Sequence, residues 1–88
     1  MIEVYTKPTC PYCHAAKRVL NELELNYSET DISRDVNKRE EMLTRSEGRT
    51  TVPQIFIRGV GVGGFTDFIQ VIEQGKLPEL LDKPGSHG

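Results

Sequence analysis

The sequence predicts one α/β domain, in which a four-stranded mixed sheet is covered by helices on both faces. Short apolar runs alternate with helical patterns in the order β-α-β-α-β-β-α. The first β-α-β segment should form a right-handed parallel unit. The last two apolar runs are close enough along the chain to pair as an antiparallel hairpin. A chain of 88 residues suits a single domain with one modest core.

The first strand and the first helix are expected on either side of a short break. Residues 2–6 form a strand pattern, because apolar Ile2 and Val4 occupy alternate positions. A helix should begin at Pro11, since proline is favoured in the first turn of a helix. One apolar stripe of this helix has helical spacing and consists of Ala16, Val19, Leu20 and Leu23.

The second strand and the second helix follow at residues 25–32 and 33–48. The helix is highly charged, with Ser33 as its expected N-cap and Gly48 as its expected stop. Its apolar stripe is thin and consists of Val36, Met42 and Leu43. The charged residues are interpreted as a solvated face with ion pairs one turn apart.

The last part of the chain should contain a hairpin and a helix. Residues 54–59 are apolar and β-branched, and residues 60–64 are expected to pair with them. The following helix has Thr66 as its expected N-cap and Gly75 as its stop, and residues 77–81 should add one further helical turn. Its apolar stripe consists of Phe65, Phe68, Ile69 and Ile72. We therefore expect a domain over residues 1–82 and a polar tail over residues 83–88.

Composition and charge narrow the classes of function. The net charge is −2, which does not favour nucleic-acid binding, and no apolar run approaches the ~20 residues of a membrane span. The chain begins MIEVYT, without the basic and apolar regions of a signal peptide, so we expect a cytoplasmic protein with no membrane partner. We also expect a monomer. In that reducing compartment, a cysteine pair is more often catalytic or metal-binding than structural.

The stretch TCPYCH, residues 9–14, has three interpretations: a c-type haem attachment site, half of a zinc site, or a thiol–disulfide redox centre. Haem requires export, an apolar pocket and a distal ligand, which neither Met42 nor His87 suitably provides. A structural zinc site needs four ligands, whereas Cys10, Cys13 and His14 supply at most three. We expect no metal and a solvent-facing His14.

Redox chemistry fits this stretch best. Cys10 directly precedes the helix at Pro11, so its sulfur should face the unpaired N–H groups of the first turn, which favours the thiolate. Lys7 can add a positive charge nearby. Cys13 lies one helical turn further along. Cys10 is therefore the predicted attacking thiol and Cys13 the predicted resolving thiol.

The order of elements and three separated motifs closely resemble the glutaredoxin family, which has a thioredoxin-like fold. The motifs are KPTCPYC (7–13), TVPQIFI (51–57) and GGFTDF (63–68), and the resemblance extends over residues 2–82. CPYC is the dithiol form of the family's motif. The resemblance implies an enzyme that reduces protein disulfides and glutathione mixed disulfides, with glutathione as the reducing co-substrate. Its partners would be glutathione and disulfide-containing or glutathionylated proteins.

The resemblance also implies a glutathione-binding site. The proline of TVP is cis in the family, which would let Val52 pair with a peptide substrate as an added strand. The N–H groups at the start of the last long helix would hold the γ-glutamyl carboxylate, and Lys7 would hold the glycine carboxylate. Arg39 or Arg49 is a further candidate for that second role. The complete set is Lys7, Tyr12, Thr51, Val52, Pro53, Gly64, Phe65, Thr66 and Asp67.

Two other functions remain open. The chain could carry an iron–sulfur cluster between two copies, held by Cys10 and by glutathione thiolates. Relatives with that role usually have serine at the position of Cys13, so the retained cysteine favours redox catalysis. Alternatively, thioredoxin reductase could supply the electrons, although the glutathione-site residues favour glutathione.

Overall fold

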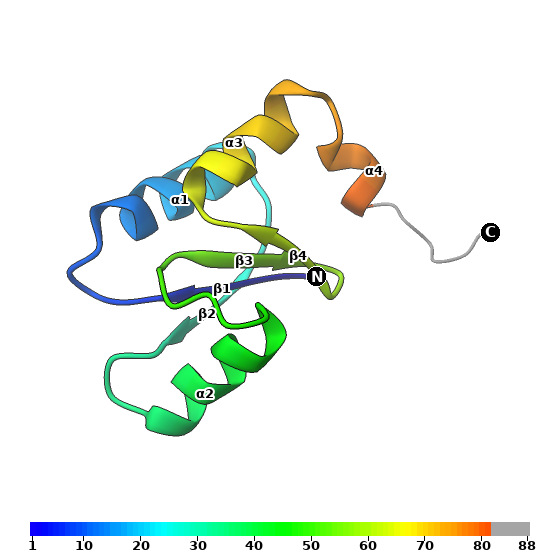
Figure 1. The fold of residues 1–88 in the computed structure, drawn as a ribbon. Helices are drawn as coiled ribbons and strands as arrows, with labels where there is room; N and C mark the ends of the chain where they lie inside the picture. The colour runs from blue at the N-terminus through cyan, green and yellow to red at the C-terminus, as the bar shows by residue number, and fades with distance from the viewer. Residues whose placement is uncertain (82–88) are drawn as a thin grey trace.

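The computed structural model describes residues 1–81 and confirms the predicted α/β architecture (Figure 1). The sheet has four strands, namely β1 (Ile2–Thr6), β2 (Ser28–Asp31), β3 (Gln54–Ile57) and β4 (Val60–Gly63). Their order across the sheet is β2-β1-β3-β4. β1 and β2 are parallel, whereas β3 is antiparallel to both β1 and β4. The predicted polar tail, residues 83–88, lies outside the described residues, as does residue 82.

The helices form two layers around this sheet. They are α1 (Pro11–Glu22), α2 (Val36–Arg45), α3 (Phe65–Glu73) and the short α4 (Leu77–Leu81). In Figure 1, α1 and α3 lie over one face of the sheet and α2 lies over the other. None of the helices within residues 1–81 is both long enough and apolar enough to cross a bilayer.

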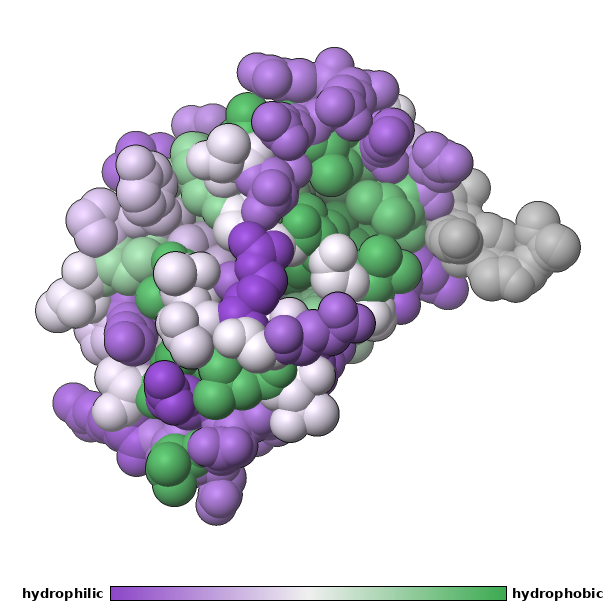
Figure 2. Space-filling view, viewed as in Figure 1, coloured by the Kyte–Doolittle hydropathy of each residue, from purple (hydrophilic) through white to green (hydrophobic). Residues whose placement is uncertain are grey.

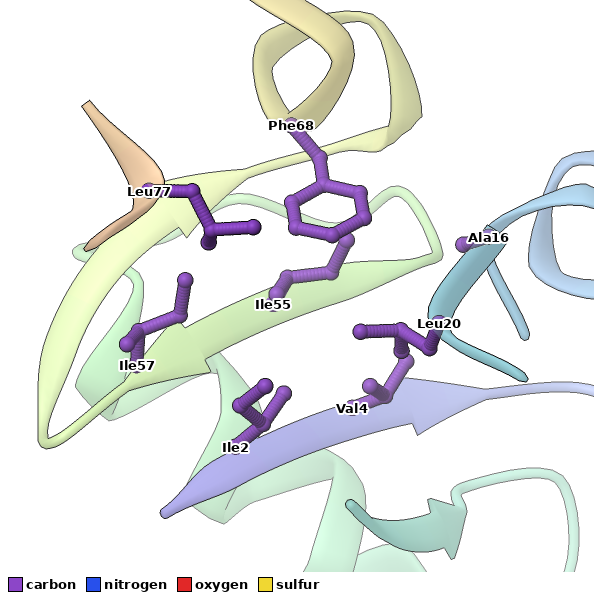
Figure 3. Packing of buried hydrophobic residues seen from close by; sticks show 8 residues of the cluster. All are labelled: Ile2, Val4, Ala16, Leu20, Ile55, Ile57, Phe68 and Leu77. Carbon is purple, nitrogen blue, oxygen red and sulfur yellow. The ribbon is translucent and has the colours of Figure 1, made fainter. Parts of the chain in front are cut away.

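The larger core fills the space between the sheet and the layer of α1 and α3. Figure 3 shows side chains of α1, α3 and α4 directed toward those of β1 and β3. The buried members of this larger core are Ile2, Val4, Ala16, Leu20, Ile55, Ile57, Phe68 and Leu77. Each fully buried large side chain contributes about 1.5–3 kcal/mol to stability, so this cluster fixes α1 and α3 against the strands.

A smaller core lies on the opposite face, under α2. Met42 of α2 is fully buried there against Tyr5, Ile32 and Phe56. Because side chains alternate along a strand, β1 sends Ile2 and Val4 to the larger core and Tyr5 to the smaller one. On the visible face in Figure 2, hydrophilic residues gather over α2, and hydrophobic atoms show mainly between α3 and α4.

The second helix begins later than predicted and uses a different cap. Asp35 is its N-cap, with its side chain accepting a hydrogen bond from the N–H of Asn37 at 2.9 Å. Ser33 instead donates its N–H and hydroxyl to Asp31, so the expectation of a Ser33 cap was wrong. Val36 is 68% exposed and takes no part in the apolar stripe. The helix ends at Arg45, before the predicted stop at Gly48.

Several other boundaries also differ from the prediction. The second strand is shorter than residues 25–32 and begins at Ser28. β3 ends at Ile57 because Arg58 and Gly59 adopt positive φ values of 51° and 83° and form the hairpin turn. In α3 the N-cap is Gly64, not Thr66, which lies inside the first turn. Leu23, expected in the stripe of α1, is its C-cap and is 43% exposed.

Candidate active site

Cys10 is the N-cap of α1, and its sulfur faces the first turn of the helix as predicted. Its backbone is extended, with φ −102° and ψ 110°, because the helix begins only at Pro11. The N–H of Cys13 donates a hydrogen bond to Cys10 Sγ at 3.1 Å. A backbone donor and the positive end of the helix both stabilise negative charge on this sulfur. Cys10 is partly exposed, so a substrate disulfide can reach its sulfur.

Cys13 lies in a contrasting environment one turn away. Its side chain is fully buried in the described structure. Burial, together with the hydrogen bond with Cys10, raises the pKa of the Cys13 thiol to about 12. Cys13 is therefore protonated at neutral pH, while Cys10 is the thiol that a substrate can reach.

The loop before β3 brings a second backbone segment to Cys10. Cys10 Sγ donates to the carbonyl oxygen of Val52 at 3.5 Å, and the Val52–Pro53 peptide bond is cis, as expected. The side chain of Gln54 stabilises this loop, because its Nε2 donates a hydrogen bond to the carbonyl oxygen of Thr51 at 2.9 Å. Gln54 is a buried polar residue at the start of β3 and is not among the predicted site residues. The only sequence signal for this role is that Gln54 is the one polar residue in the apolar strand β3.

The glycine pair between β4 and α3 has two separate roles. Gly63 has φ +111°, and a Cβ placed there would collide with the carboxylate of Asp67. Gly64 has ordinary backbone angles, and a Cβ there would meet only the carbonyl oxygen of Pro53, at 3.6 Å. The Gly64 N–H donates to Asp67 Oδ2 at 2.9 Å, so Asp67 caps the helix from within.

These segments enclose a cleft of about 250 Å³. Its lining residues are Tyr12, Arg49, Thr51, Val52, Pro53, Gly64, Phe65, Thr66 and Asp67. The rings of Tyr12 and Phe65 stack at one wall, with centroids 5.9 Å apart and planes at 27°. Arg49 approaches Asp67 at 3.4 Å, and the guanidinium is half exposed. The cleft therefore combines an aromatic wall, a cation, and the start of a helix with free N–H groups.

The comparisons with known proteins agree with this geometry. The sequence model of the glutaredoxin family matches residues 2–62, which include both cysteines and the cis proline. This chain belongs to the glutaredoxin family. Glutaredoxins are thiol–disulfide oxidoreductases, and the Cys10–Cys13 pair gives this glutaredoxin the groups for that chemistry.

Individual relatives cover nearly the whole chain. Glutaredoxin 3 of Escherichia coli is 49% identical over 80 residues, which make up 91% of this chain and 95% of the relative. Glutaredoxin 1 of Rickettsia prowazekii is 38% identical over 92% of this chain and 86% of its own length. Among solved structures, the Brucella melitensis glutaredoxin has a TM-score of 0.79 at 44% identity, covering 99% of this chain and 92% of that one. A buckwheat glutaredoxin–glutathione complex has a TM-score of 0.82 at 26% identity, covering 99% and 81%.

The predicted site residues of this glutaredoxin fall into three groups. Apart from Lys7, all the residues expected to bind glutathione line the cleft. The Cys10 sulfur lies next to the cleft, because it contacts the carbonyl oxygen of the lining residue Val52. Lys7 is exposed and does not line the cleft. Of the two further candidate cations, Arg49 lines it and Arg39 does not.

His14 and the cysteines also bear on metal binding. His14 is exposed, as expected, and its Nε2 lies 2.8 Å from the carbonyl oxygen of Pro8. A carbonyl only accepts, so this nitrogen carries a proton. Within residues 1–81, no three His, Cys, Asp or Glu side chains are grouped so that they could hold a metal ion.

Proposed function

We propose that this glutaredoxin reduces protein disulfides and glutathione mixed disulfides, with glutathione as the reducing co-substrate. The observation that carries the proposal is the position of Cys10. Its sulfur lies 3.5 Å from the Val52 carbonyl, at the edge of a cleft closed on the far side by the start of α3. A peptide thiol bound in this cleft would have its sulfur next to Cys10.

The chemistry of the cleft matches the two ends of glutathione. The γ-glutamyl carboxylate would accept hydrogen bonds from the free N–H groups of Phe65 and Thr66 at the start of α3. The central peptide would pair with the backbone of Val52. Arg49, which lines the cleft, would contact the glycine carboxylate, and the exposed Lys7 would add positive charge from outside it. The aromatic wall of Tyr12 and Phe65 would cover the apolar part of the ligand.

The reaction proceeds by two thiol–disulfide exchanges. The Cys10 thiolate attacks a substrate disulfide, forms a mixed disulfide, and releases one substrate thiolate, which takes up a proton. Cys13, after losing its proton, then attacks Cys10 and releases the second substrate thiol. Two glutathione molecules reduce the resulting Cys10–Cys13 disulfide and leave as glutathione disulfide. When the substrate is a glutathione mixed disulfide, a second glutathione can replace Cys13 as the resolving thiol.

The partners follow from this cycle. Disulfide-containing and glutathionylated proteins would dock on the exposed side of Cys10 as substrates of a monomeric enzyme. A thiol pair that must return to the reduced form after each turnover suits a reducing compartment such as the cytoplasm.

A coupled assay tests the proposal. Glutathione, glutathione reductase and NADPH should support rapid reduction of hydroxyethyl disulfide by the wild-type protein, and Cys10→Ser should abolish it. Replacing glutathione and its reductase with thioredoxin reductase should give little turnover. Equal or faster turnover with thioredoxin reductase would refute glutathione as the electron donor. A brown protein after anaerobic purification with glutathione would instead favour iron–sulfur cluster binding.

A further inference from the structure

A polar cluster joins α1, one turn after Cys13, to β1 and β2. Lys17 of α1 forms an ion pair with Glu29 of β2, with 2.9 Å between Nζ and Oε2. The hydroxyl of Thr6 donates to the same carboxylate oxygen at 2.7 Å. Thr6 is buried at the end of β1, directly before the turn that carries Cys10. Two donors therefore converge on one oxygen of Glu29.

The cluster fixes the direction of the Lys17 side chain. Lys17 follows Cys13 by four residues in α1, so both side chains lie on the same side of the helix, one turn apart. An unpaired lysine side chain at this position would extend into solvent, but the ion pair with Glu29 holds the Lys17 side chain against β2. Only 23% of the Lys17 side chain is exposed. Its ammonium is thereby held against the sheet, on the side of α1 that also carries Cys13.

The charges around Cys13 explain what this arrangement can do. From the turn before α1, the Cys10 sulfur disfavours a Cys13 thiolate, and the N–H of Lys7 favours it. From α1 itself, the Lys17 ammonium favours the thiolate. Glu29 and Tyr27 from the neighbouring edge of the sheet favour the charged form of Lys17. Burial has the largest influence on Cys13 and opposes ionisation, whereas the smaller influence of the Lys17 charge acts in the opposite direction.

We propose that Lys17, held by Glu29 and Thr6, is a positioning residue for the second exchange, where its ammonium stabilises the Cys13 thiolate that resolves the mixed disulfide. The proposal rests on the dithiol route of the proposed function. In this step the Cys13 thiol gives a proton to solvent, and its electron pair forms the Cys13–Cys10 bond. The bond between Cys10 and the substrate sulfur breaks, and that sulfur leaves with the electron pair.

The second exchange can be measured without glutathione. The aromatic disulfide 5,5′-dithiobis(2-nitrobenzoate) serves as the substrate. Cys10 attacks this disulfide and releases one thionitrobenzoate, and Cys13 then displaces the second thionitrobenzoate from Cys10. Stopped-flow absorbance resolves the two phases. Lys17→Met should slow the second phase and leave the first within twofold of wild type. For each unit by which loss of the cation raises the pKa of Cys13, the thiolate fraction falls tenfold and its nucleophilicity rises about threefold, so the second phase slows about threefold per unit.

Three further measurements separate this role from a structural one. Removing the cation should move the pH dependence of the second phase upward, and Lys17→Arg should restore both its rate and its pH dependence. Lys38→Met is the matched control, because Lys38 pairs with Glu41 on α2, on the other face of the sheet. It should leave both phases unchanged. Thermal unfolding of each variant checks that the fold is intact.

The outcomes that would overturn the proposal are distinct from failure of the proposed function. Equal slowing of both phases, or a second phase in Lys17→Met with the rate and pH dependence of wild type, would remove Lys17 from the mechanism. If Lys17→Met does not fold, Lys17→Gln is measured in the same way and judged by the same criteria. Loss of turnover with glutathione, while the second phase still depends on Lys17, would refute only the glutathione-dependent function.

Discussion

Cys10 and Cys13 are three positions apart and have different chemical environments. The first turn of α1 separates them, so that Cys10 stays at the surface and Cys13 enters the core. The same turn provides the N–H that contacts the Cys10 sulfur. This asymmetry supports the proposed roles, in which the accessible thiol attacks and the buried thiol resolves.

The division of roles predicts that Cys13→Ser separates two activities. Reduction of a glutathione mixed disulfide should persist at a rate within a fewfold of wild type, because glutathione can replace Cys13 as the resolving thiol. Reduction of the disulfides of insulin should fall by tenfold or more, because the mixed disulfide with protein then waits for an external thiol. The coupled glutathione reductase assay measures the first activity and insulin turbidity the second. Equal loss of both activities would contradict the assignment.

At the scale of elements, the junction between β4 and α3 completes the site. The left-handed backbone of Gly63 turns the chain from the sheet edge into the helix, and Asp67 then binds the N–H of Gly64. Gly64 and Pro53 both line the cleft, and a Cβ at Gly64 would meet the Pro53 carbonyl oxygen at 3.6 Å. The junction thus places the start of α3 opposite the loop that contacts Cys10.

We expect alanine at Gly63 to affect stability and alanine at Gly64 to affect glutathione binding. Gly63→Ala should lower the free energy of unfolding by about 1–3 kcal/mol, because φ +111° is strained for a residue with Cβ and the methyl group collides with Asp67. Gly64→Ala has room for its Cβ and should remain near wild type in stability, but should raise the KM for glutathione. Urea unfolding and steady-state kinetics give the two values. A stable Gly63→Ala variant would show that this backbone geometry is not required.

At the scale of the whole molecule, α2 is attached to the sheet by both apolar and charged contacts. The Arg45 guanidinium binds Glu3 at 2.8 Å, contacts the hydroxyl of Tyr5 at 2.9 Å, and lies 4.2 Å from the centroid of the Phe56 ring. Tyr5 in turn donates to Glu41 of α2. Since α2 leads into the loop that carries Arg49 and Val52, these contacts support one wall of the cleft.

This attachment should make stability depend on pH in the acid range. The hydrogen bond from Arg45 lowers the pKa of Glu3 below its ordinary 4.5. The stabilisation is therefore present above about pH 4.5 and is lost as pH falls through the lowered pKa. Glu3→Gln should reduce the free energy of unfolding at pH 7 by about 1 kcal/mol, since the pair is partly exposed.

Urea unfolding of wild type and Glu3→Gln across pH 3–7 checks the expectation. The difference between the two proteins should shrink toward acid pH and remain constant between pH 6 and 7. A difference that persists unchanged at the lowest pH would show that the effect of the substitution is not electrostatic.

The sequence alone predicted the order of the elements, the two cysteines at the start of α1, and most of the residues that line the cleft. These features depend on local signals: alternation in β1, proline at the start of α1, and the paired glycines before α3. Local signals were weaker at α2, where half of the positions are charged. The N-cap at Asp35 and the exposure of Val36 therefore differed from the prediction.

The tertiary structure decided which distant polar groups meet. Lys17 with Glu29, Arg45 with Glu3, and Arg49 with Asp67 are pairs from different elements. The sequence predicted ion pairs within the charged helix instead, and the one observed there joins Lys38 to Glu41. The physical reason is that long charged side chains have many conformations of similar energy in an isolated helix. Packing of α1 and α2 on opposite faces of the sheet selects the conformations in which Lys17 and Arg45 meet their partners.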